Sequence, residues 1–124
     1  MNWTATSGIV LALAVIIGAF GAHGLKGRLD AYSMTIYERA VMYHFFHALG
    51  MLIVSAILSA GLLSRSAGNW VCGLLLAGVI LFSGSLYALA LTGNRMLGAI
   101  TPIGGLSFIA AWVVLAITAL RSKS

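Results

Sequence analysis

Few side chains in this 124-residue sequence can do chemistry, and three of them are histidines. His44 and His47 stand three residues apart within one apolar run, and His23 follows an earlier run. A polar group buried in an apolar span is retained only with a partner, so a histidine there is a functional hypothesis by default. The imidazole and hydroxyl groups near these positions are therefore the first candidates for a site.

Hydroxyl-bearing residues accompany the histidines at matching places along the chain. Tyr43 and His47 are four residues apart and share one face of a helix. If four apolar runs form helices of alternating direction, the ends of the first and third meet the starts of the second and fourth at one membrane face. The candidate residues at that face, called here the polar cluster, are His23, Tyr43, His47, Ser83, Ser85, Tyr87 and Thr101.

Two interpretations of the polar cluster stay open. In the first, its side chains form hydrogen bonds between neighbouring helices and fix their packing, which is common in membrane bundles and is favoured for His47. In the second, the cluster binds haem, a quinone or a lipid headgroup between helices. Two axial haem ligands approach from opposite sides, so His44 and His47 on one helix cannot both serve, whereas His23 with one of them can.

The sequence gives little support for a metal site or for proton-coupled transport. Its two acids, Asp30 and Glu38, both lie outside the apolar runs. A divalent metal needs several nitrogen or oxygen ligands, and proton exchange depends on an acid within the membrane. The single cysteine, Cys72, cannot form an intramolecular disulfide and is expected to be a buried apolar side chain. We predict no metal site and no enzymatic activity, and a small transporter is the third interpretation.

The composition places these residues in a membrane protein. Mean hydropathy is +1.08, and 7% of residues are charged, whereas a soluble domain carries about 25%. Four runs without Asp, Glu, Lys or Arg correspond to roughly 30 to 36 Å of helix, which matches a bilayer core of about 30 Å. The predicted fold is an all-α, antiparallel bundle of four transmembrane helices in one domain over residues 1–124. The helices are expected at about 3–22, 40–63, 70–91 and 100–120.

The connecting segments set the order of the helices and leave their orientation open. Short connections at 64–69 and 92–99 make neighbouring helices antiparallel. In the longer segment 23–39, Thr35 and Glu38 have the spacing of a capping box and predict the start of the second helix. Lys and Arg divide almost equally between the two sides, so the positive-inside rule gives no orientation. The bases also form no stripe for nucleic acid, and they are Lys26, Arg28, Arg39, Arg65, Arg95, Arg121 and Lys123.

Small residues in three of the runs are expected to mark helix crossings. Gly18 and Ala22 form a small-xxx-small pair, which permits close approach of two backbones. Gly84, Gly104 and Gly105 are expected to do the same in the third and fourth runs. Packing therefore explains these residues without a ligand.

Four motifs in a fixed order resemble a known family of membrane proteins. They are GAFGAHG at 18–24, Tyr43-x-x-x-His47, FSGSLY at 82–87 and TPIGGLSF at 101–108. Across almost its whole length the chain is similar to the proteins grouped as domain of unknown function 423, which have eukaryotic relatives of the transmembrane protein 256 type. The resemblance implies a four-helix protein of the bacterial plasma membrane and implies no activity. It matches His23, Tyr43 and His47 to motif positions and gives no ligand role to His44.

These observations together favour a structural or accessory role in the bacterial inner membrane. The expected partners are the lipid bilayer and either further copies of the chain or a larger membrane complex, because packing motifs outnumber reactive groups. Binding of haem, a quinone or a lipid is the alternative.

Overall fold

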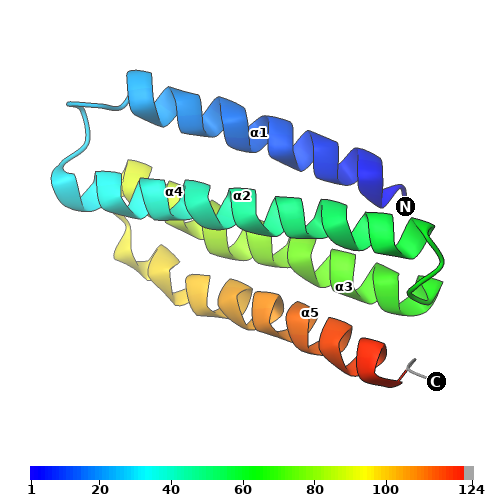
Figure 1. Cartoon of the computed structure of the whole chain (residues 1–124). Coiled ribbons are helices and arrows are strands. Elements are labelled where there is room, and N and C mark those ends of the chain that lie inside the picture. Colours follow the sequence, from blue (N-terminus) through cyan, green and yellow to red (C-terminus); the bar gives the residue numbers. More distant parts are fainter. Residues whose placement is uncertain (122–124) are drawn as a thin grey trace.

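The computed structural model describes residues 1–121, which contain helices and turns but no strand. Four antiparallel rods make up the molecule (Figure 1), and each is long and apolar enough to cross a bilayer. The predicted all-α fold with four membrane helices is therefore confirmed. In chain order the elements are α1 (Trp3–His23), α2 (Ala31–Ser59), α3 (Arg65–Gly78), the π-helix η1 (Val79–Ser83), α4 (Gly84–Thr92), the 3-10 helix η2 (Arg95–Ala99) and α5 (Thr101–Arg121).

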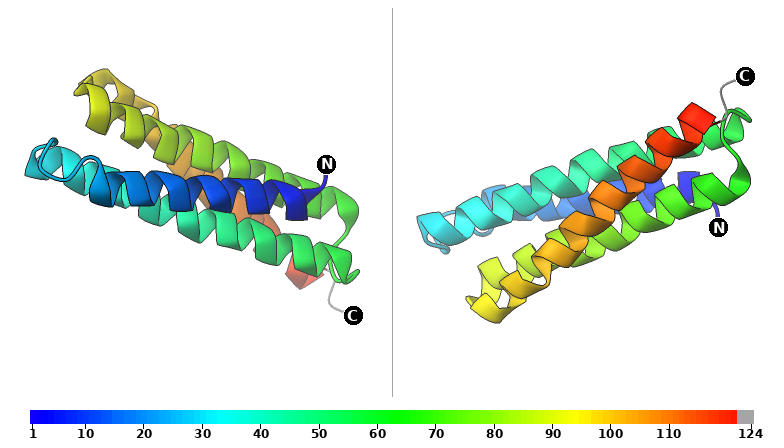
Figure 2. Two further views of the ribbon diagram at one scale, coloured as in Figure 1. Left: turned by 90° about the horizontal axis from the view of Figure 1, so that it is seen from above. Right: turned by 90° about the horizontal axis from the view of Figure 1, so that it is seen from below.

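The rods are arranged around a central pair. This pair consists of α2 and the third rod, formed by α3, η1 and α4; α1 covers one side of it and α5 crosses the other side at an angle (Figure 2). The core lies where these rods meet, and its buried side chains include Met51, Leu75 and Phe108. Large apolar side chains also cover the outer faces, as expected where lipid replaces water.

The start of α2 differs from the prediction. The helix begins at Ala31 rather than near residue 40, because the Asp30 side chain caps it by accepting a hydrogen bond from the Ser33 amide at 2.7 Å. The capping box predicted at Thr35 is wrong, since its hydroxyl donates to the Ala31 carbonyl within the helix. At 29 residues α2 is about 43 Å long, so it exceeds the roughly 30 Å bilayer core.

The connection between α2 and α3 is shorter than predicted. Ser59 ends α2, and Gly61 follows in the left-handed conformation with φ 78°. Ser64 then caps α3 by accepting from the Ala67 amide at 3.2 Å, so this helix begins at Arg65 rather than at residue 70. The bounds of α1 and α5 agree with the predicted runs to within a residue, while Lys123 lies outside the described part of the chain.

The third rod contains one wide π-turn at η1, where α5 crosses it. Gly104 of α5 packs directly on the η1 backbone, and a Cβ atom there would meet the Phe82 amide nitrogen and lie 2.8 Å from the Leu81 carbonyl carbon. The crossing predicted at Gly104 is confirmed. Gly18 likewise faces Val41 of α2. The prediction for Gly84 is wrong, because a Cβ at that position would touch nothing within 4 Å.

Candidate functional site

His44 is the histidine that joins helices. Its Nε2 lies 2.9 Å from the Val10 carbonyl oxygen of α1, and its Nδ1 lies 2.8 Å from the Tyr87 hydroxyl of α4. A carbonyl only accepts, so Nε2 carries the hydrogen and Nδ1 accepts the hydrogen of the Tyr87 hydroxyl. The ring is 4% exposed. Both nitrogens of a neutral imidazole are thus used, and none is left for a ligand.

His47 makes a different set of contacts. Its Nδ1 donates to the Tyr43 carbonyl of its own helix at 2.9 Å, so the hydrogen bond to a neighbouring helix predicted for it is wrong. Across the helix interface it stacks instead, with its ring centroid 3.6 Å from that of Phe108 and the planes inclined by 14°. The Nε2 lone pair has no hydrogen-bond partner among residues 1–121. This nitrogen is therefore able to accept a hydrogen bond or to bind a ligand.

An aromatic layer surrounds His47. The Tyr43 ring lies 5.7 Å from His47 and 4.4 Å from Phe82 between ring centroids, and Phe82 in turn lies 5.6 Å from Phe108. These rings come from α2, η1 and α5, so they pack three rods together. Tyr43 is therefore a packing residue in this structure.

The hydroxyl groups of the serine and threonine residues in the polar cluster all form hydrogen bonds between rods. The Ser83 hydroxyl donates to the Ala40 carbonyl of α2 at 2.8 Å. The Ser85 hydroxyl lies 2.5 Å from that of Thr101 and links α4 to α5. Among the described side chains no buried nitrogen or oxygen lacks a hydrogen-bond partner. These hydroxyl groups therefore form separate contacts between helices rather than one shared site.

His23 does not join the other cluster residues. It is the last residue of α1 and is exposed, and no hydrogen bond to its ring is found within residues 1–121. Haem ligation by His23 together with His44 also conflicts with the full occupancy of the His44 ring. The seven predicted residues therefore share an end of the bundle without sharing a site.

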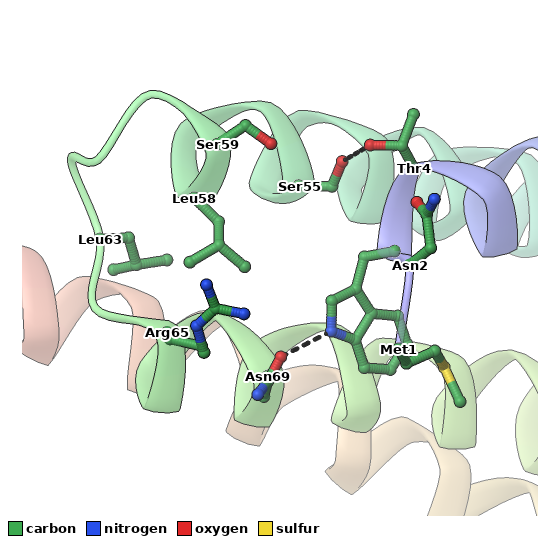
Figure 3. A pocket seen from close by; sticks show the side chains of 10 residues that line it. Met1, Asn2, Thr4, Ser55, Leu58, Ser59, Leu63, Arg65 and Asn69 are labelled. Carbon is green, nitrogen blue, oxygen red and sulfur yellow. Dashed lines mark hydrogen bonds between the residues drawn. The ribbon is translucent and has the colours of Figure 1, made fainter.

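A cavity of about 470 Å³ lies at the opposite end of the bundle (Figure 3). We call it the terminal cavity. The sequence did not predict this cavity, because its polar residues are far apart along the chain. Arg65 and Asn69, which stand in one short predicted connection, could have indicated a polar site at this end. Its walls are Met1, Asn2, Trp3, Thr4, Ser55, Leu58, Ser59, Leu63, Arg65 and Asn69.

Two hydrogen bonds fix the walls of the terminal cavity. The Trp3 indole donates to the Asn69 side-chain oxygen at 2.9 Å and ties α1 to α3. The Thr4 and Ser55 hydroxyls lie 2.7 Å apart and tie α1 to α2. Between them the Arg65 side chain extends from the first turn of α3 into the cavity (Figure 3).

The terminal cavity carries positive charge without a compensating acid. No Asp or Glu lines it, and Arg65 forms no ion pair within residues 1–121. Both acids of the sequence lie at the other end of α2, where Glu38 is exposed and Asp30 caps the helix. The hydrogen bonds that Ser33 donates hold the pKa of Asp30 below its ordinary value of 3.8. Among the described residues, the acidic side chains are thus confined to the end that holds the polar cluster.

The remaining metal-ligating and nucleophilic groups do not assemble. Within residues 1–121 no three His, Cys, Asp or Glu side chains come together in a geometry that could hold a metal ion. Cys72 is completely buried in the core, as expected, with its sulfur 3.8 Å from the Met51 carbonyl oxygen.

Comparison with known proteins agrees with a membrane protein. The model of the family described as "Protein of unknown function (DUF423)" matches residues 17–105. A UPF0382 membrane protein of Staphylococcus haemolyticus is 51% identical over 88% of this chain and 87% of its own length, and UPF0382 membrane protein YwdK of Bacillus subtilis is 42% identical over 88% of both chains. No solved structure gives a significant match. This four-helix membrane protein therefore belongs to the DUF423 family.

Proposed function

We propose that this protein is a non-catalytic structural or accessory component of the bacterial inner membrane. The observation that carries the proposal is the use of polar side chains within the rods for packing. His44, Ser83 and Ser107 each hydrogen-bond to a carbonyl oxygen of a neighbouring rod. A side chain held in this way fixes the geometry of the bundle and is not free for proton transfer or nucleophilic attack.

A component of a larger assembly needs an outer face that contacts another protein chain. The four rods offer comparable positions for detecting such a face, because each exposes an isoleucine to a similar extent of 61–63%. These residues are Ile9, Ile53, Ile80 and Ile109. Contacts in lipid depend on packing rather than on hydrophobic burial, so we expect one face, and not all four, to touch a partner.

Site-specific photocrosslinking in native membranes tests this proposal. A photoreactive residue replaces one of the four isoleucines at a time, and the fully buried Val54 provides the control that must give no adduct with another chain. We expect protein adducts from one or two positions and lipid adducts from the others. Lipid adducts alone from all four positions, with a monomer recovered in mild detergent, would contradict an accessory role.

Binding of a small ligand at His47 is the second candidate, and the unpartnered Nε2 favours it. A lone pair on that nitrogen suits a quinol hydroxyl or a haem iron. The test is the absorption spectrum and quinone content of protein purified from its native membrane. A Soret band or stoichiometric quinone that is lost in His47→Phe would support this candidate, while a spectrum of protein alone would exclude a bound chromophore and leave packing as the role of His47.

A further inference from the structure

We propose that the terminal cavity binds the phosphate of an anionic phospholipid headgroup, with Arg65 as its principal contact. This inference is independent of the accessory role proposed above. It concerns the end of the bundle opposite the polar cluster, where the sequence suggested no ligand.

The position of the terminal cavity fits a headgroup. It lies where α1 and α3 begin and where α2 ends, and these ends mark the boundary of the hydrocarbon layer. Trp70, one residue beyond Asn69, is 65% exposed, and exposed indole rings concentrate at the level of lipid headgroups. A lipid that diffuses against the bundle therefore brings its phosphate to the mouth of the cavity.

The chemistry of the walls fits a phosphate. The guanidinium of Arg65 offers a planar set of donors that matches two phosphate oxygens at once. Nearby hydroxyl and amide groups, including those of Ser59 and Asn2, can add hydrogen bonds. The volume of about 470 Å³ lies within the roughly 300–1,000 Å³ of small-molecule sites.

The backbone around the cavity adds to its affinity for anions. Two helices, α1 and α3, direct the positive ends of their dipoles toward this region. The carbonyl groups at the end of α2 would oppose an anion, but two of them accept hydrogen bonds from loop amides: Gly61 donates to Leu58 at 3.1 Å, and Leu62 donates to Ile57 at 3.2 Å. Among the described residues, no carboxylate lines the cavity that Arg65 faces, and these two carbonyls are occupied by the loop.

Lipid titration of the purified full-length chain tests the proposal. Native mass spectrometry in detergent compares short-chain phosphatidylglycerol, which is anionic, with phosphatidylcholine, which is neutral overall. We expect tighter binding of phosphatidylglycerol and a loss of about ten- to a hundredfold in Arg65→Gln, the range expected for removing hydrogen bonds to a charged group. Arg65→Lys retains the charge without the planar donors and is expected to bind at an intermediate level.

Arg95→Gln is the matched control. Arg95 is also exposed and is also the first residue of its helix after a capping residue, Asn94, but it lies outside the cavity. Its loss is expected to leave phosphatidylglycerol binding unchanged. Equal losses of phosphatidylglycerol binding in both variants would show an unspecific attraction of charge. No loss in Arg65→Gln would show that Arg65 does not bind the headgroup, and either result would overturn the site.

A second pair of variants keeps the test valid if Arg65→Gln does not fold. Ser59→Phe fills the cavity without removing charge and is expected to weaken binding, whereas Ser66→Phe, on the exposed surface of α3 outside the cavity, is expected to leave binding unchanged. Inorganic phosphate is added as a competitor. If millimolar phosphate displaces the lipid and binds as tightly, the ligand is a free anion and the lipid assignment is wrong.

Discussion

The two ends of the bundle hold polar residues in opposite ways. At the end with the polar cluster, most polar side chains are paired with one another or with backbone carbonyls, as in His44 with Tyr87 and Ser85 with Thr101. The exceptions among residues 1–121 include the exposed His23 and the Nε2 atom of His47. At the other end, Arg65 faces an open cavity and forms no ion pair with any residue of the described part of the chain. The polar cluster thus has many functional groups, most of which are held by hydrogen bonds. The terminal cavity has fewer groups, but it has open space and a positive charge without an acidic partner among residues 1–121. A binding site needs open space and groups that are free to bind, so residue type alone does not locate it.

Adding a side chain where α5 crosses η1 is expected to lower the stability of the bundle more than any other substitution proposed. In Gly104→Val the new side chain meets the backbone of η1, which cannot turn aside as a side chain can. We expect the free energy of unfolding in mixed micelles to fall by about 3 kcal/mol, at the upper end of overpacking costs. Gly84→Val is the control, since a Cβ there has open space. Equal losses in the two variants would show that helix propensity, and not the crossing, is being measured.

Replacing His44 comes next in size. His44→Phe keeps a ring of similar size but leaves the Tyr87 hydroxyl without its partner, so we expect a loss of about 1–3 kcal/mol in the same unfolding assay. Tyr87→Phe combined with His44→Phe should cost less than the sum of the single changes, because both remove one hydrogen bond. Strict additivity would mean that the two side chains act independently.

The same substitution at His47 sharpens the contrast between the two histidines. His47→Phe retains the stack on Phe108 and removes only a hydrogen bond within its own helix. We expect a change in unfolding free energy below about 0.5 kcal/mol, the range of ordinary neutral substitutions. A loss as large as that of His44→Phe would indicate that His47 holds a ligand or partner that stabilises the bundle.

The smallest expected effect concerns the acid that caps α2. The pKa of Asp30 is lowered in the folded protein, so its carboxylate stabilises the fold fully above its ordinary value of 3.8 and loses this effect as the pH falls through the lower, folded value. Asp30→Ala should therefore be slightly less stable than the parent chain at pH 7, and the difference should shrink below pH 3.8. Thermal unfolding at a series of pH values measures this, and a difference that grows in acid would contradict the assignment.

The membrane fold could be predicted because it depends on length and hydropathy. Runs of apolar residues identify spans whatever their neighbours are, and all four were located. The start of α2 was placed too late because polar residues continue a helix beyond the bilayer, where a charge such as Glu38 costs little. The cap at Asp30 was not predicted, because Thr35 and Glu38 have the spacing of a capping box whereas Asp30 is followed three residues later by Ser33.

The site could not be predicted in the same way because it depends on helix rotation. His44 and His47 are three residues apart, and their roles are decided by which of them faces α1 and α4. Since α2 is apolar on all sides, hydropathy does not report that rotation. The terminal cavity depends further on how residues far apart in sequence, such as Trp3 and Asn69, meet at the ends of three helices.

The π-turn in the third rod sets the phase between α3 and α4. The turn at η1 holds one residue more than an α-helical turn, so every side chain after it points in a different direction from the one a regular α-helix would give it. If the same residues formed a regular α-helix instead, the faces of α4 would be rotated by about 100° relative to α3. Tyr87 would then leave His44, and Ser85 would leave Thr101. The contacts between helices at the end with the polar cluster therefore depend on the π-turn as well as on the identity of the residues.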